Sequence, residues 1–217
     1  MDKAIVLKDI VFSYANGRPI FNGLNFSYET GRKIGITGPN GCGKSTLFNL
    51  IMGLVMPCSG IIEIFGERRK TEKDFSDIRT RIGMVFQNPE DQIICPNVKE
   101  DIAFGPLNQG KSFDEAERTA SEVMETFGLE KYKNSNPFNL SGGEKHLVAL
   151  AGIAAMRPEI LLLDEPLEWL DAGHRDTVLN YLKGADSYIL VSQDSGLLRQ
   201  VCPDGMYEID EKPGSKM

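Results

Sequence analysis

The spacing of hydrophobic positions changes twice along the chain and divides it into three stretches. Near the amino terminus, Ala4–Tyr14 and Leu24–Tyr28 are β-forming runs on either side of a turn-rich stretch, residues 15–19. This pattern predicts an antiparallel sheet. Between about residues 89 and 158 the spacing is typical of amphipathic helices. The pattern therefore predicts a helical segment inserted between two parts that are rich in strands.

Short apolar runs predict the strands of the remaining parts. They cover residues 33–37, 61–65, 82–86, 160–163, 188–192 and 205–209. The run 160–163 is apolar at every position, which is typical of a parallel strand that is buried on both faces. A helix over residues 44–52 follows the first of these strands. The polar segment Glu211–Met217 is expected to form a loose tail.

Two helices of the inserted segment carry start signals. Ser112 and Glu115 have the spacing of a capping box, and the helix that follows has an apolar face. The residues of that face are Ala116, Ala120, Val123, Met124 and Phe127. A second helix is expected to open at Ser141 and to run to about Met156.

Composition narrows the classes of function. The chain has 217 residues, is 41% hydrophobic and has a formal net charge of −7, which suits one globular unit, or a core with a small lobe, without a broad basic surface for nucleic acid. No apolar run reaches the roughly 18 residues of a membrane span, and the first residues lack the pattern of a signal peptide. We expect a soluble intracellular protein with four free cysteines.

The strongest motif follows the strand over residues 33–37. Residues 38–45 read Gly-Pro-Asn-Gly-Cys-Gly-Lys-Ser, which fits the phosphate-loop pattern GxxxxGK[ST]. Glycines let the backbone curl around phosphate oxygens and present N–H groups to them. Lys44 is expected to reach the β- and γ-phosphates of a nucleotide, and Ser45 to bind Mg²⁺. The expected nucleotide-binding residues here are Asn40, Gly41, Cys42, Gly43, Lys44, Ser45 and Thr46.

An acidic pair ends the apolar run of residues 160–163. Asp164 is placed to hold Mg²⁺, and Glu165 to act as the general base that activates water. The alternative is an acidic turn between a strand and a helix. The phosphate loop upstream favours the catalytic interpretation.

A third motif indicates which of the families with a phosphate loop this chain resembles. Residues 140–144, Leu-Ser-Gly-Gly-Glu, resemble the LSGGQ signature of ATP-binding-cassette ATPases, and they lie between the phosphate loop and the acidic pair, as in that family. The resemblance implies that Ser141, Gly142, Gly143 and Glu144 contact the γ-phosphate of ATP bound to a second ATPase subunit, identical or different. Ser141 and Glu144 also have the spacing of a capping box, and both interpretations can hold.

The resemblance covers nearly the whole chain and assigns further roles. Tyr14 resembles the aromatic that stacks on adenine, or is simply a strand aromatic. Gln87 resembles the Q-loop glutamine that contacts Mg²⁺ and senses a membrane partner, and Leu170-Asp171 match the end of the D-loop. The implied fold class is α/β: a P-loop NTPase core with a mixed or parallel sheet, an amino-terminal antiparallel subdomain and an inserted helical subdomain over about 89–158, all in one domain.

Two runs, residues 87–92 and 100–108, resemble the energy-coupling-factor importers of cobalt, nickel and vitamins. That resemblance implies an ATPase on the cytoplasmic face of the membrane, bound to a transmembrane scaffold subunit and a substrate-binding membrane subunit, with ATP and Mg²⁺ as cofactors and without nucleic acid. The transported substrate and the homo- or heterodimeric state stay open.

The sequence departs from the family at three places. Gln193 stands where the family has a histidine that contacts the γ-phosphate, and an amide carries no charge and relays no proton. Leu167, Glu168 and Trp169 replace small D-loop residues, and His146 and Leu147, expected on the helix surface, replace polar and basic ones. Slow hydrolysis, or pairing with a more active ATPase, is the alternative function. A binding module gated by ATP, and a cassette protein of DNA repair or translation, are the other classes considered.

Overall fold

The computed structural model describes residues 3–15, 17 and 19–209, and the chain divides into two compact units. Unit 1 comprises residues 1–82 and 186–217, and unit 2 comprises residues 83–185. The expected tail, Glu211–Met217, and two residues of the expected turn, Asn16 and Arg18, lie outside the described residues. The placement of all parts in one domain stays a prediction.

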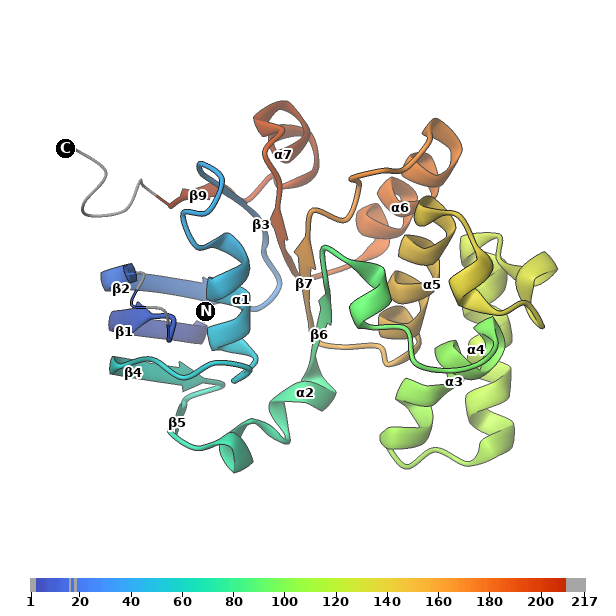
Figure 1. Ribbon diagram of the computed structural model, residues 1–217, viewed down its shortest axis with the longest axis horizontal. Helices are drawn as coiled ribbons and strands as arrows, with labels where there is room; N and C mark the ends of the chain where they lie inside the picture. Colours follow the sequence, from blue (N-terminus) through green and yellow to red (C-terminus); the bar gives the residue numbers. More distant parts are fainter. Residues whose placement is uncertain (1–2, 16, 18, 210–217) are drawn as a thin grey trace. The chain divides into compact units, whose positions relative to one another are not determined.

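Unit 1 contains a four-stranded antiparallel sheet with the order β2-β1-β4-β5 (Figure 1). Its strands are β1 (Lys3–Ser13), β2 (Pro19–Glu29), β4 (Ser59–Ile64) and β5 (Glu67–Arg69). The antiparallel pairing of the first two strands is confirmed, but β2 begins five residues earlier than expected because Ile20 and Phe21 pack into the core despite the turn signals before them. The sequence did not predict β5, since its Glu-Arg-Arg run is polar and is held by pairing with β4.

Three parallel strands of unit 1 carry the first candidate site. β3 (Lys33–Thr37) pairs with β8 (Tyr188–Val191) on one side and with β9 (Met206–Glu208) on the other. The helices of this unit are α1 (Lys44–Ile51), α2 (Ile78–Arg81), α7 (Ser195–Val201) and a 3-10 helix (Glu72–Phe75). A Cβ at Gly35 would lie 3.1 Å from Leu198, so glycine lets α7 pack closely on β3.

Unit 2 is mainly helical. Its helices are α3 (Val98–Asn108), α4 (Phe113–Phe127), α5 (Gly142–Ala155), α6 (Ala172–Gly184) and the 3-10 helices Pro89–Asp91, Glu130–Tyr132 and Pro137–Asn139. The strands are β6 (Ile82–Val85), which starts at the unit boundary, and its neighbour β7 (Ile160–Asp164). Helices α3, α4 and α5 pack against one another. The inserted helical segment between the strands is therefore present.

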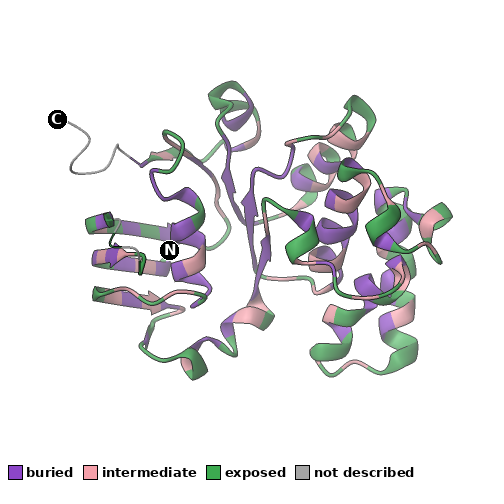
Figure 2. Cartoon of the chain, viewed as in Figure 1, coloured by how far each residue is buried: buried purple, intermediate pink, exposed green. Residues whose placement is uncertain are grey.

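The burial of β7 and α4 follows the apolar positions of their sequences. Figure 2 shows β7 buried along its length, as its uninterrupted apolar run predicts. Helix α4 starts with the expected capping box of Ser112 and Glu115 and buries its predicted face except for Val123, which is half-buried. Within the described residues, no helix is long and apolar enough to span a bilayer.

Candidate functional site

The phosphate-loop residues connect β3 to α1 and take a backbone conformation that requires glycine. Gly38, Gly41 and Gly43 have φ angles of 150°, 71° and 115°. A Cβ at Gly43 would lie 2.7 Å from both Ile20 and Phe21, and a Cβ at Gly38 would lie 2.5 Å from the carbonyl oxygen of Ile209. A side chain at these positions would displace the loop or its supports.

The donors of this loop suit a phosphate group. The Nζ atom of Lys44 donates to the carbonyl oxygens of Gly38 at 2.8 Å and of Pro39 at 3.1 Å, which holds the ammonium group across the loop. Because Gly43 is the N-cap of α1, no side chain caps the first turn of the helix. The first N–H groups of a helix attract anions. Ser45 is exposed, so its hydroxyl is accessible to a cation.

Tyr14 and Gln193 belong to the same unit as this loop. The hydroxyl of Tyr14 is hydrogen-bonded to that of Thr46 in α1 at 3.0 Å, and its ring packs edge-to-face on Phe12. Tyr14 is 38% exposed. Tyr14 thus lies next to the phosphate loop, one residue beyond the end of β1. Gln193 is exposed and follows Ser192, whose N–H donates to the carbonyl of Ile36 in β3. Gln193 therefore follows a strand that ends beside the start of the loop.

The acidic pair lies at the end of β7 in unit 2. Asp164 is 3% exposed and Glu165 is 9% exposed. Glu165 has a φ angle of 50°, in the left-handed region that glycine prefers. Such a conformation costs of order 1–3 kcal/mol in a residue with a side chain, and strain of this kind is frequent at functional sites. The position of the pair at the carboxyl end of a buried strand is confirmed.

The signature residues form the start of α5. Ser141 is the N-cap, its hydroxyl accepts from the N–H of Glu144 at 3.3 Å, and the Glu144 carboxylate accepts from the N–H of Ser141 at 2.8 Å. The capping-box interpretation is confirmed, while the phosphate contact stays a prediction. The hydroxyl of Tyr132 also donates to Glu144 and, with the Ser141 bonds, lowers the pKa of that carboxyl. Gly142 has open space where a Cβ would be.

The residue that resembles the Q-loop glutamine contacts the segment that resembles the D-loop within unit 2. The side-chain amide of Gln87 donates to the Glu168 carboxylate at 3.1 Å. Trp169, two residues before the family's D-loop aspartate, is 76% exposed and has a φ angle of 65°. Asp171 begins α6 as its N-cap, accepting from the N–H of His174 at 3.0 Å.

The expectation that His146 and Leu147 lie on the helix surface is wrong. They are 5% and 1% exposed, respectively. Helix α5 packs against α3, α4, α6 and the 3-10 helix Pro89–Asp91, so most of its circumference is covered. His146 also contacts the main chain of Gln87. The only signal of this burial in the sequence was that His146 and Leu147 replace the polar and basic residues that the family usually has there.

Each unit thus assembles its own group of predicted residues. The phosphate loop, Tyr14 and Gln193 belong to unit 1, whereas Gln87, the signature and the acidic pair belong to unit 2.

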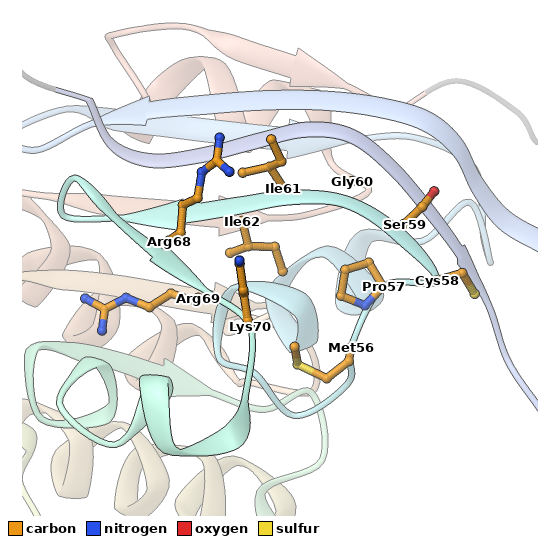
Figure 3. A pocket seen from close by; sticks show the side chains of 10 residues that line it. All are labelled: Met56, Pro57, Cys58, Ser59, Gly60, Ile61, Ile62, Arg68, Arg69 and Lys70. Carbon is orange, nitrogen blue, oxygen red and sulfur yellow. The ribbon is translucent and has the colours of Figure 1, made fainter.

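A separate pocket of about 220 Å³ lies on the antiparallel sheet of unit 1 (Figure 3). Residues 56–62 and 68–70 line it, and none of them is a predicted site residue. Figure 3 shows the Arg69 side chain directed away from the Arg68 and Lys70 side chains. Arg69 instead forms ion pairs with Glu67 at 3.1 Å and Asp77 at 2.9 Å.

Comparison with known proteins identifies the family. The family described as ABC transporter matches residues 21–168. The chain therefore belongs to the ABC transporter family. Several relatives within this family have more specific names. The chain is 46% identical over 179 residues to the energy-coupling factor transporter ATP-binding protein EcfA of Methanothermobacter thermautotrophicus, which covers 82% of this chain and 58% of that protein. The EcfA of Methanocaldococcus jannaschii is 46% identical over 165 residues, 76% of this chain and 59% of that protein.

The chain thus spans 58% and 59% of the length of these two relatives. Among solved structures, it is similar to cbiO1 from Clostridium perfringens, part of the ABC transporter complex cbiONQ. The TM-score is 0.80 at 29% identity, covering 96% of this chain and 85% of that one. The cassette MJ0796, in a dimeric post-hydrolysis state bound to ADP and Pi, gives a TM-score of 0.82 at 27% identity, covering 90% of each chain. The α/β cassette fold expected from the sequence is confirmed.

Proposed function

We propose that this chain binds and hydrolyses ATP and that the hydrolysis energises a membrane importer of the energy-coupling-factor type. The observation that carries the proposal is the loop from β3 to α1, where Gly43 has no room for a side chain and Lys44 is held across the loop. The similarity to the EcfA proteins supports the importer class. A metal ion such as cobalt or nickel, or a vitamin, is the transported substrate.

The residues have distinct roles in this proposal. Main-chain N–H groups of residues 40–46 and the Lys44 ammonium bind the phosphates, and Tyr14 stacks on adenine. Ser45, Gln87 and Asp164 offer the oxygen ligands that Mg²⁺ prefers and would hold the ion, which would supply positive charge against the phosphates. Glu165 accepts a proton from the attacking water as general base. Gln193 donates a hydrogen bond to the γ-phosphate.

The proposed partners follow from the signature. Ser141, Gly142, Gly143 and Glu144 bind the γ-phosphate held by a second ATPase subunit, so two subunits close over two nucleotides. The dimeric cassette bound to ADP and Pi supports this arrangement. A transmembrane scaffold and a substrate-binding membrane subunit complete the complex, and the chain works at the cytoplasmic face of the membrane.

The test is ATP turnover by the purified chain and by Glu165→Gln. Loss of a general base lowers kcat by about 10²–10⁴-fold, while binding of ATP persists because the phosphate loop is unchanged. Glu130→Gln is the matched control, since Glu130 is exposed in the same unit. Equal turnover of the parent and Glu165→Gln would refute the role of Glu165.

A second candidate is a cassette that hydrolyses ATP slowly and pairs with a more active subunit. It is favoured by the neutral Gln193 and by the contact between Gln87 and Glu168, which engages the Q-loop amide with a D-loop carboxylate. Turnover at least tenfold higher after mixing with a second ATPase subunit would support it. Full turnover of the chain alone would refute it.

A further inference from the structure

The Q-loop segment, residues 86–92, is fixed to one face of α5 by several polar contacts in unit 2. Lys145 forms an ion pair with Glu90. The side chain of Gln92 donates to the carbonyl of Ala149 at 3.0 Å and accepts from the N–H of Phe86 at 3.2 Å. The two contacts with α5 follow Gln87 in the sequence, and the bond from Phe86 to Gln92 closes the segment around it.

His146 of α5 also contacts this segment, and it is buried. Its Nε2 lies 3.1 Å from the carbonyl oxygen of Gln87, and its Nδ1 lies 3.0 Å from the carbonyl oxygen of Gly142 in the signature. Both partners are carbonyl oxygens, which only accept, so the imidazole donates to Gln87 in the tautomer that carries its hydrogen on Nε2 and to Gly142 in the other tautomer. His146 is 5% exposed. Water therefore does not readily reach a carbonyl oxygen that loses its hydrogen bond to His146, and the unpaired buried group costs free energy.

The main chain and the side chain of Gln87 are therefore held by different elements. His146 of α5 holds the carbonyl, and Glu168 of the D-loop holds the amide. A main-chain shift at Gln87 would move its side chain directly, because the two share one Cα atom. Misplacing a positioning contact by about 1 Å can cost up to about 10²-fold in rate.

We propose that His146 is a positioning residue for Gln87: it holds the Gln87 main chain against the signature helix, so that the Gln87 amide is presented at a fixed place and the segment 86–92 moves with α5. This inference deepens the proposed function and rests on it for the catalytic role of Gln87. His146 itself touches neither nucleotide nor metal in this proposal.

The decisive variant is His146→Leu, which keeps a side chain of similar size and removes both contacts. Val148→Ala is the matched control, because Val148 is fully buried two residues further along the same helix and has no polar side-chain atoms. Both variants are made in the full chain, alone and combined with Gln87→Ala. Should His146→Leu not fold, His146→Met takes its place with the same expectations, because its flexible thioether fills the space without an N–H or O–H donor.

Steady-state ATP turnover gives the first readout. We expect His146→Leu to lower kcat about tenfold or more with KM changed less than twofold, and Val148→Ala to change kcat less than twofold. In the Gln87→Ala background, His146→Leu should cost less than twofold, because the amide that it positions is gone. An equal fold loss in both backgrounds would show a merely structural role and would overturn the proposal.

Hydrogen–deuterium exchange gives a readout that needs no turnover. Peptides covering residues 86–92 should exchange at least tenfold faster in His146→Leu than in the parent, but not in Val148→Ala. Unchanged exchange in His146→Leu would overturn the proposal. A parent that hydrolyses no ATP, alone or mixed with a second ATPase subunit, would refute the proposed function, and the exchange result would still decide whether His146 holds the loop.

Discussion

Replacing Gly43 by alanine tests whether the phosphate loop depends on a backbone that only glycine permits. The φ angle of Gly43 is 115°, and an added Cβ would lie 2.7 Å from Ile20 and 2.7 Å from Phe21. Both neighbours belong to β2 and are buried. The methyl group therefore meets packed side chains and an unfavourable backbone conformation at once.

The backbone strain and the overpacking together determine the free-energy cost of Gly43→Ala. A residue with a Cβ in a sparsely populated region of φ and ψ costs of order 1–3 kcal/mol, and overpacking a core typically costs a further 1–3 kcal/mol. The sum, about 2–6 kcal/mol, is a large part of the roughly 5–15 kcal/mol that stabilises a typical domain. A shift of the loop costs less free energy than keeping the loop in place against both effects. Such a shift moves Lys44 and the first N–H groups of α1.

Isothermal titration with Mg-ATP and urea denaturation measure the two consequences. Gly43→Ala should bind ATP at least about 30-fold more weakly, since losing about 2 kcal/mol of phosphate contacts corresponds to that factor. Gly66→Ala is the matched control: its φ angle is 79°, and a Cβ there meets nothing within 4 Å. It should lose about 1 kcal/mol of stability and keep its affinity for ATP.

Unchanged ATP affinity together with unchanged stability in Gly43→Ala would refute this reasoning. A loss of ATP affinity in Gly66→Ala equal to that in Gly43→Ala would refute it as well, because the effect would then not arise from the loop.

Two further predictions concern other residues. Tyr14→Ala should weaken ATP binding about tenfold, because stacking on a base is worth about 1–3 kcal/mol, while Tyr14→Phe should bind nearly as the parent does; equal affinities for all three proteins would leave Tyr14 as a packing partner of Phe12. Asp101 accepts from the N–H groups of Ile94 and Cys95, and burial raises its pKa. Its contribution to stability is therefore greatest below the ordinary pKa of about 3.9 and is lost as pH rises through the raised value. Asp101→Asn keeps the acceptor without the charge, so its stability relative to the parent in urea denaturation should increase from about pH 4 to pH 7; a constant difference would contradict the assignment.

Local signals in the sequence were sufficient for several parts of the structure. The strand-to-helix turn at residues 38–45, the capping boxes at Ser112 and Ser141 and the buried run ending at Asp164 depend on residues close together in the chain. Such elements follow from backbone conformation, N-cap hydrogen bonds and the spacing of apolar positions.

Features that depend on contacts distant in the sequence could not be predicted. Strand β5 exists because a polar run pairs with β4, and β2 extends to Pro19 because Ile20 and Phe21 pack on the phosphate loop. The burial of His146 depends on a contact with a carbonyl 59 residues away. No periodicity within a short window reports such contacts.

The central claim is that the loop before Lys44 binds the phosphates of ATP. Titration of Mg-ATP into the purified chain and into Lys44→Ala tests it most directly, with circular dichroism to show that both are folded. We predict binding by the parent and about 100-fold weaker binding by Lys44→Ala, since charge-assisted phosphate contacts are worth about 2–3 kcal/mol. Equal affinity of the two folded proteins for Mg-ATP would contradict the claim.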